Sequence, residues 1–285
     1  ARDPLGKLRT ARMLRQERFD CAILLQNAFE AALLAWLAGI PRRIGYSRDG
    51  RAPLLTDPIP VPTSGEIPRH ERFYYLAMLE RAGIIDRLPS DAPISLSRSA
   101  DLHARGAQRL AETGLRPPVI GISPGAAFGS AKRWLPERFT EAGAGLAREI
   151  GASVAVFGSE TERNLCQQVA QGIQEQGAQV HNFAGETSLG AFIELAAGCA
   201  LYLTNDSGAM HVTSALGVPA VAVFGPTDET ATGPAGPLTT VVRENVDCSP
   251  CLLRECPIDH RCMVRVSAAT VVRTALEILA SDEHR

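Results

Sequence analysis

The chain has 285 residues, 45% of them hydrophobic, which is enough to build the cores of two domains of ordinary size. Its 29 basic and 31 acidic residues nearly cancel, and this balance gives no indication of nucleic acid as a partner. The longest apolar run, residues 31–40, is shorter than the roughly 20 residues that a membrane-spanning helix needs. We therefore expect a globular protein that does not itself cross a membrane.

The first 115 residues carry an irregular pattern of strands and helices. The expected elements are strands at 21–26 and 42–47, helices at 30–39, 69–83 and 100–114, and a Pro- and Gly-rich passage at 51–68. We interpret residues 1–115 as part of an α/β domain whose opening strand, loop and helix are not visible in the sequence.

From residue 116 onward, short apolar strands alternate regularly with amphipathic helices. Strands are expected at 118–123, 152–158, 178–183, 200–205 and 219–225, and helices at 135–150, 160–176, 188–198, 208–217 and 267–285. This alternation predicts a parallel sheet covered by helices on both faces. Residues 116–285 should therefore form a Rossmann-like domain.

Ligands of open parallel sheets bind beyond the carboxyl ends of the strands, so the loops that follow the strands are the places to inspect. The first of these loops reads PGAAFGSAKRW, residues 124–134. Its small residues let backbone amides approach a ligand, and Lys132 adds a positive charge, which together suit a diphosphate. The alternative is a long surface loop with a solvated Lys132 and Arg133.

The second loop, SETERN at residues 159–164, begins the next expected helix. Ser159 can cap this helix, and Glu160 or Glu162 in its first turn interacts favourably with the helix dipole. Capping explains these residues without a ligand. A carboxylate in this place can also hold the hydroxyl groups of a ribose.

The third loop, TNDSGAMH at residues 204–211, again joins a strand to a helix. Asp206 or Ser207 can cap the helix, and Gly208 leaves the free amides of the first turn open to an anion. His211 lies one turn into the helix, within reach of a phosphate or a sugar. The alternative keeps Asp206 as an ordinary cap and His211 as a half-buried helix residue. All three loops should emerge at the same edge of one sheet.

The seven cysteines are distributed unevenly. Three of them lie singly in apolar segments, whereas four fall within fifteen residues: Cys248, Cys251, Cys256 and Cys262. This distribution does not resemble a disulfide framework and fits a reducing cytoplasm. The cluster could hold zinc, but its second pair is spaced more loosely than in common zinc sites, and the alternative is reduced cysteines that are structurally packed or face the acceptor.

A basic run stands in the first domain, at Arg42, Arg43, Arg48 and Arg51. Such a run is usually a solvated face. If these residues line a cleft, their guanidinium groups suit an anionic acceptor, because they bind phosphate and carboxylate in a forked geometry. We expect Asn27, Arg42, Arg43 and Arg48 to contribute to this acceptor site.

Taken together, five segments resemble the lipopolysaccharide heptosyltransferases of glycosyltransferase family 9: PGAAFGSAKRW, VFGSETE, FAGETSLGAFIELAAG, TNDSGAMHVTSALGVPAVAVFGPTDE and CSPCLLRECPIDHRCM. The resemblance implies the glycosyltransferase B architecture, in which two Rossmann-like domains face a cleft. It also implies inverting transfer of heptose from ADP-L-glycero-D-manno-heptose to the inner core of lipopolysaccharide, with no essential metal or cofactor.

The resemblance further implies roles for individual residues on the donor side. Lys132 would bind the donor diphosphate and act in catalysis, with Ala126 and Ala127 behind it. Glu162 would hold the ribose, and Thr187 would lie near the adenine.

In the third loop the resemblance assigns the heptose contact and a catalytic role to Asp206, and the phosphates to Ser207, Gly208 and His211. The acceptor would be a heptosyl-Kdo-lipid A precursor, an anionic lipopolysaccharide core. We expect a cytoplasmic protein with peripheral contact to the inner membrane surface.

One departure from the family pattern concerns the general base. Family members begin with a strand and a Gly-Asp loop whose aspartate is assigned this role, and no segment here matches it. We expect the first half of the acceptor-side domain, with this base, to be absent from the chain, which would then be inactive.

Two rival functions remain compatible with the sequence. One is a related transferase that uses another nucleotide sugar, and the other is a non-catalytic module that binds a nucleotide sugar or zinc. An NAD-dependent dehydrogenase is disfavoured, since no G-x-G-x-x-G follows an expected strand.

Overall fold

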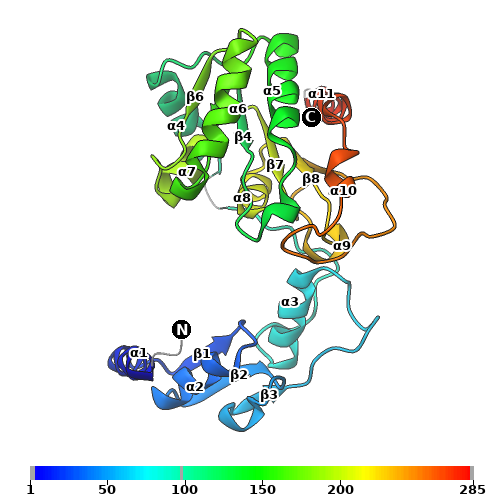
Figure 1. Ribbon diagram of the computed structural model, residues 1–285. Helices are drawn as coiled ribbons and strands as arrows, with labels where there is room; N and C mark the ends of the chain where they lie inside the picture. The colour runs from blue at the N-terminus through cyan, green and yellow to red at the C-terminus, as the bar shows by residue number, and fades with distance from the viewer. Residues whose placement is uncertain (1–3, 97–98, 283–285) are drawn as a thin grey trace. The chain divides into compact units, whose positions relative to one another are not determined.

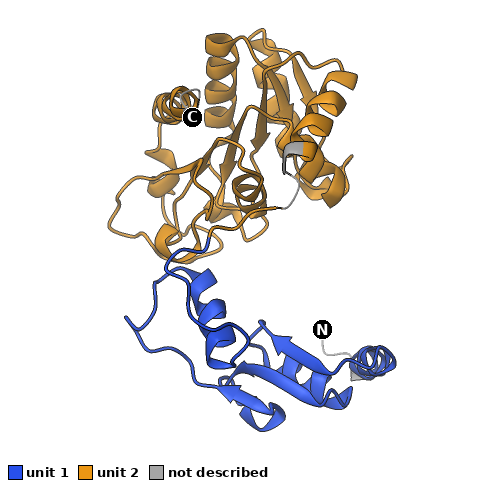
Figure 2. Ribbon diagram, turned by 180° about the vertical axis from the view of Figure 1, so that it is seen from behind, with its two compact units in different colours: residues 1–92 blue, residues 93–285 orange. Residues whose placement is uncertain are grey.

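The computed structural model describes residues 4–96 and 99–282 of the chain. It contains two compact units, residues 1–92 and residues 93–285, which are coloured separately in Figure 2. Both units are α/β, as the sequence predicts.

Unit 1 is built on a small parallel sheet of strand order β1-β2-β3. Its elements are α1 (Pro4–Gln16), β1 (Cys21–Leu24), α2 (Phe29–Leu37), β2 (Arg42–Tyr46), the 3-10 helix η1 (Ala52–Leu54), β3 (Asp57–Ile59) and α3 (Glu71–Arg81). In the central strand, Ile44 pairs with Ile23 of β1 and with Asp57 of β3. Strand β3 lies inside the Pro- and Gly-rich passage and was not predicted, because three residues containing a proline carry little strand signal.

Unit 2 is a doubly wound sheet with six parallel strands, in the order β6-β5-β4-β7-β8-β9. The strands are β4 (Val119–Ser123), β5 (Ser153–Val156), β6 (Val180–Asn182), β7 (Leu201–Asn205), β8 (Ala220–Val223) and β9 (Thr239–Val242). Counted from β4, this is the order 3-2-1-4-5-6 of dinucleotide-binding folds. The order reverses between β4 and β7, and ligands bind at such a point.

Helices connect these strands and cover both faces of the sheet (Figure 1). They are α4 (Ser99–Glu112), α5 (Pro136–Ile150), α6 (Arg163–Glu175), α7 (Leu189–Ala197), α8 (Gly208–Leu216), α9 (Glu229–Thr232), α10 (Arg261–Val264) and α11 (Ala268–Asp282), with 3-10 helices η2 (Ser130–Lys132) and η3 (Glu160–Glu162). Helices α5 and α8 end where Gly151 and Gly217 adopt the left-handed conformation, at φ 65° and 73°. The expected helices therefore form with small shifts of their ends.

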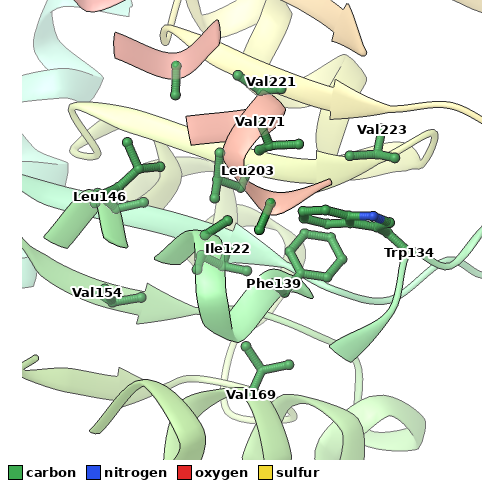
Figure 3. Packing of buried hydrophobic residues seen from close by; sticks show 14 of the residues in the cluster. Ile122, Trp134, Phe139, Leu146, Val154, Val169, Leu203, Val221, Val223 and Val271 are labelled. Atoms are coloured by element: carbon green, nitrogen blue, oxygen red, sulfur yellow. The ribbon is translucent and has the colours of Figure 1, made fainter. Parts of the chain in front are cut away.

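Alternating strand residues point to two hydrophobic cores, one on each side of the sheet. Helices α5, α6 and α11 pack on the side of Ile122, Leu203 and Val221. Figure 3 shows these three side chains gathered with Trp134 and Phe139, whose rings meet edge to face at 5.0 Å. The other side is covered by α4, α7 and α8. A sheet buried on both faces explains why its strands read as continuous apolar runs.

Helix α4 belongs to unit 2, and the division of the chain therefore falls after Ala92 rather than after residue 115 as expected. Two glycines allow this packing. A Cβ atom on Gly106 would lie 2.0 Å from the backbone oxygen of Glu194, and one on Gly198 would lie 2.2 Å from the carbonyl carbon of Gly106. The backbones of α4 and α7 can approach so closely only without side chains at these positions.

Strand β9 was also missed by the sequence reasoning, since its four residues follow a segment rich in Gly and Pro. The last three residues of the expected terminal helix lie outside the described part of the chain. Within residues 4–96 and 99–282, the helices are all too short or too polar to span a bilayer.

Candidate functional site

A pocket of about 290 Å³ opens at the carboxyl edge of the unit 2 sheet, where the strand order reverses. It is lined by Ser123, Gly125, Ala126, Ala127, Phe157, Gly158, Ser159, Glu162, Thr187, Ser188, Leu189, Phe192, Ser207, Gly208 and Ala209. Six of the nine residues expected to bind a donor are among them: Ala126, Ala127, Glu162, Thr187, Ser207 and Gly208. The three loops singled out in the sequence therefore do meet around one cavity.

Glu162 is held by a capping box at the start of η3. One oxygen of its carboxylate accepts hydrogen bonds from the backbone N of Ser159 at 2.9 Å and from the Ser159 hydroxyl at 2.8 Å. Its other oxygen faces Gly125 so closely that a Cβ atom there would lie 2.0 Å away. The capping interpretation is thus observed, and the same carboxylate forms part of the pocket wall.

Lys132 and Asp206 form a buried ion pair beside the pocket. The ammonium nitrogen lies 2.6 Å from Oδ2 of Asp206, and the two side chains are 13% and 4% exposed. The Thr227 hydroxyl donates to the same oxygen at 2.6 Å. The ammonium also lies 4.9 Å from the ring centre of Phe128, a cation–π distance. The structure thus brings the two residues expected to be catalytic into direct contact.

The first turn of α8 has no side-chain cap. Ser207 is the N-cap residue, but its side chain accepts no capping hydrogen bond, and its hydroxyl lies 3.1 Å from that of Thr204. The carboxylate of Asp206 is turned toward Lys132 instead. The interpretation of Asp206 as an ordinary N-cap is therefore wrong. The first residues of this helix, Gly208 and Ala209, line the pocket. The positive end of the helix dipole therefore faces the cavity, as an anion site requires.

His211 is exposed and is not among the residues that line the pocket. It lies on the first turn of α8 as predicted, in the same helix as Gly208. The half-buried position of the alternative interpretation is also wrong.

An aromatic cluster forms one wall of the pocket and was missed by the sequence reasoning. The rings of Phe157 and Phe192 line the cavity and meet edge to face at 5.5 Å, and Phe183 stacks on Phe157 at 5.2 Å. Behind them, burial raises the pKa of Tyr202, whose hydroxyl lies 2.7 Å from that of Ser123. Each of these aromatics reads as an ordinary core residue in the sequence, so only the fold reveals that two of them face a cavity.

The cysteine segment does not form the possible zinc site. Cys262 is buried, Cys251 is exposed, and Cys248 and Cys256 are intermediate. Among the described residues, no three His, Cys, Asp or Glu side chains are grouped to hold a metal ion. The possible zinc site at Cys248, Cys251, Cys256 and Cys262 is therefore not supported by the structure, because these side chains are divided between the core and the surface.

The same segment instead supports the loop that carries Lys132. The backbone N of Ala131 donates to the carbonyl of Arg254 at 3.0 Å, and Nε2 of His260 lies 2.8 Å from the carbonyl oxygen of Ala131. A Cβ atom on Gly129 would lie 2.2 Å from the Arg254 oxygen. The two loops therefore pack backbone to backbone.

In unit 1, the residues expected to bind an acceptor have partners within the unit. Arg42 pairs with Asp57 at 3.2 Å and Arg48 with Asp49 at 3.4 Å. Arg43 donates from Nε to the carbonyl of Leu54 at 2.7 Å. These contacts explain the positions of the arginines without a ligand, and an acceptor would have to compete with them.

Asn27 belongs to a network centred on Arg51. Arg51 is completely buried, so the solvated-face interpretation is wrong for this residue. Its guanidinium donates to the Tyr46 carbonyl at 2.8 Å, to Oδ1 of Asn27 at 3.0 Å and to the Gln26 carbonyl. Asn27 in turn donates to the Tyr74 hydroxyl at 3.2 Å. Burial lowers the pKa of Arg51, since these neutral partners compensate only part of its lost hydration.

The fold and the pocket define the class of the protein. A parallel sheet of order 3-2-1-4-5-6, with glycine-rich loops and a helix N-terminus around a cavity at the reversal point, is a nucleotide-binding Rossmann-like fold. A family model described as glycosyltransferase family 9 (heptosyltransferase) matches residues 7–261. The chain belongs to this family, and the resemblance inferred from its motifs is confirmed.

Relatives and solved structures agree with this assignment. The chain is similar to lipopolysaccharide heptosyltransferase 2 of Escherichia coli K12, at 35% identity over 238 residues, which covers 81% of this chain and 66% of the relative. A structure titled E. coli ADP-heptose lps heptosyltransferase II matches with a TM-score of 0.75 and 28% identity, covering 98% of this chain and 82% of that chain. A family 9 glycosyltransferase structure from Veillonella parvula matches with a TM-score of 0.77 and 25% identity, covering 97% and 78%. The predicted glycosyltransferase B class of fold is confirmed.

Proposed function

We propose that this chain holds the donor for transfer of heptose from ADP-L-glycero-D-manno-heptose to a heptosyl-Kdo-lipid A acceptor in the inner core of lipopolysaccharide. The observation that carries this proposal is the pocket at the sheet reversal, where six of the expected donor-binding residues line one cavity. The similarity to lipopolysaccharide heptosyltransferases supports the same reaction.

The pocket has suitable chemistry for the ADP part of the donor. Its aromatic wall at Phe157 and Phe192 offers an apolar surface for adenine beside Thr187, and the carboxylate of Glu162 can accept hydrogen bonds from ribose hydroxyls. The diphosphate then lies over the small residues Ala126 and Ala127 and the amides of the first turn of α8.

Lys132 and Asp206 have distinct roles in this proposal. As the bond between the anomeric carbon and the phosphate oxygen breaks, negative charge accumulates on the leaving ADP, and the Lys132 ammonium and the α8 amides stabilise it. Asp206 contacts the heptose and orients it. Lys132 is held by its contact with Asp206 at 2.6 Å, and Asp206 directly precedes Ser207 and Gly208 of the pocket wall.

The remaining partners follow from the proposed substrate. The acceptor is an anionic lipopolysaccharide core that is attached to lipid, so the protein would work in the cytoplasm, in peripheral contact with the inner membrane surface. The proposed chemistry places charge stabilisation on Lys132 and the amides, and we expect binding of ADP to persist in EDTA.

Titration calorimetry with ADP and UDP tests the donor. We expect ADP to bind at least tenfold more tightly than UDP, because the pocket is proposed to fit a purine beside Phe157 and Phe192. Tighter binding of UDP would instead support the transferase for another nucleotide sugar. Transfer to a heptosyl-Kdo-lipid A acceptor is measured after a family N-terminal segment with its general base is joined to the chain, and binding of ADP-heptose without transfer would then support the non-catalytic module.

A further inference from the structure

Asn205 is the last residue of β7 and is completely buried beside the candidate site. Its side chain makes three hydrogen bonds, all to backbone groups. Nδ2 donates to the carbonyl of Pro124 at 2.8 Å and to that of Gly125 at 3.3 Å, and Oδ1 accepts from the backbone N of Trp134 at 2.9 Å. A single carboxamide therefore binds both ends of the loop 124–134.

This loop holds the residues proposed to bind the diphosphate, Ala126, Ala127 and Lys132. Its end at Trp134 is itself fixed, because the indole is buried and its Nε1 donates to the carbonyl of Val266 at 3.0 Å. Asn205 connects this fixed end to the start of the loop. The next residue, Asp206, contacts the Lys132 ammonium directly.

We propose that Asn205 is a positioning residue, which closes the loop 124–134 and thereby sets the place of Lys132 and of the loop amides against the donor diphosphate. This inference rests on the proposed function for the identity of the donor. It assigns no contact between Asn205 and the substrate. Asn205 acts through the backbone groups that it binds.

The chemistry of the position favours a carboxamide. Two carbonyls require donors and one backbone N–H requires an acceptor, and all of these groups are close to a buried side chain. An aspartate of the same shape would set a carboxylate oxygen against the carbonyls of Pro124 and Gly125. It would therefore push the start of the loop away while keeping the contact with Trp134.

The test compares Asn205→Asp with Ser153→Ala in the full chain. Ser153 is a matched control, because it is also buried and bonds across elements, to Arg116 N at 3.0 Å and Gln179 Oε1 at 3.1 Å, but lies at the opposite edge of the sheet. Calorimetry measures the affinities for ADP and for adenosine. If Asn205→Asp disturbs the positioning of the phosphates, it lowers the affinity for ADP about tenfold and the affinity for adenosine less than twofold. Ser153→Ala changes neither affinity by more than about twofold.

A double-variant cycle with Lys132→Ala separates positioning from general damage. We expect the effect of Asn205→Asp on ADP affinity to be at least threefold smaller when Lys132 is absent, since part of the effect passes through this side chain. An equal effect in both backgrounds, or an equal loss of ADP and adenosine affinity, would overturn the proposal. If Asn205→Asp does not fold, Asn205→Ser, which leaves room for a bridging water, is measured in the same way.

The outcome also separates this inference from the proposed function. If the wild-type chain binds UDP rather than ADP, the donor assignment is wrong, and the same cycle with UDP and uridine tests Asn205, because the diphosphate is common to both nucleotides. Binding of neither nucleotide overturns both proposals.

Discussion

Substitution of Gly125 by alanine tests the contact between the first two loops of the pocket. The added Cβ atom would lie 2.0 Å from Oε1 of Glu162 and 2.3 Å from its Cδ, whereas ordinary contacts begin at 3.4 Å. The carboxylate must therefore move by more than about 1 Å. This movement breaks its hydrogen bonds to Ser159, and loss of such a cap costs about 1 kcal/mol of the free energy of unfolding.

The same movement removes the proposed ribose contact from the pocket. We expect Gly125→Ala to lower ADP affinity about tenfold, as measured by calorimetry, and to lower stability by about 1 kcal/mol in urea. Glu162→Ala should have similar effects, because it removes the same carboxylate. The decisive measurement is the double variant, in which the added methyl group meets no carboxylate and should cost little beyond Glu162→Ala alone. Fully additive losses would refute the reasoning.

Three further substitutions or reactions test other parts of the fold. Gly106→Ala should cost about 1–3 kcal/mol in urea unfolding, because the backbone of α7 cannot move aside; an unchanged midpoint would contradict the close helix packing. Arg51→Met should cost about 2–4 kcal/mol, seen as faster hydrogen exchange in β1 and β2, since it removes a donor from the Gln26 carbonyl and from Oδ1 of Asn27 and one of the two donors to the Tyr46 carbonyl. Iodoacetamide at pH 8 should modify exposed Cys251 within minutes, as followed by mass spectrometry. It should modify Cys166 only after unfolding, because burial raises the pKa of Cys166 to about 12.

The pKa of Cys166 also gives a direction for the pH dependence of stability. The folded state holds this proton more tightly than the unfolded state, whose thiol has a pKa near 9.0. The resulting stabilisation is complete below about pH 9 and is lost as the pH rises toward 12. We therefore expect the free energy of unfolding to fall less between pH 8 and pH 10 in Cys166→Ala than in the wild type.

The sheet of unit 2 could be predicted from sequence because each of its main strands is buried on both faces and is followed by an amphipathic helix. That pattern is local, so periodicity detects it. Strand β9 and strand β3 escaped detection because three or four residues next to Gly and Pro carry no clear period. The limits of unit 1 also depend on a long-range contact, the approach of Gly106 to Gly198, which no local pattern encodes.

The candidate site, too, could be predicted only in part from the sequence. Its loops could be located, because they follow predicted strands that must end at one edge of the sheet. The directions of the side chains could not be predicted. Asp206 turns from the helix toward Lys132, and Arg51 turns into the core, since each finds partners supplied by distant segments. The roles of Phe157 and Phe192 depend on a cavity that exists only once three loops are assembled.

The pair of Lys132 and Asp206 has a consequence for donor binding. With its ammonium 2.6 Å from a carboxylate, Lys132 presents little net charge to a diphosphate, and Asp206 repels the phosphates. Asp206→Asn should therefore raise ADP affinity severalfold. Lys132→Met should lower ADP affinity at least tenfold.

The two variants should also differ in their free energy of unfolding. Lys132→Met leaves the carboxylate of Asp206, which is 4% exposed, with the hydrogen bond from Thr227 but without the Lys132 ammonium, and should cost about 3 kcal/mol. The double variant Lys132→Met/Asp206→Asn should recover much of this loss, because no buried charge is left without its partner. If Asp206→Asn and Lys132→Met weaken ADP equally, the carboxylate does not oppose the donor, and its proposed role of orienting the heptose must include a favourable contact with the nucleotide.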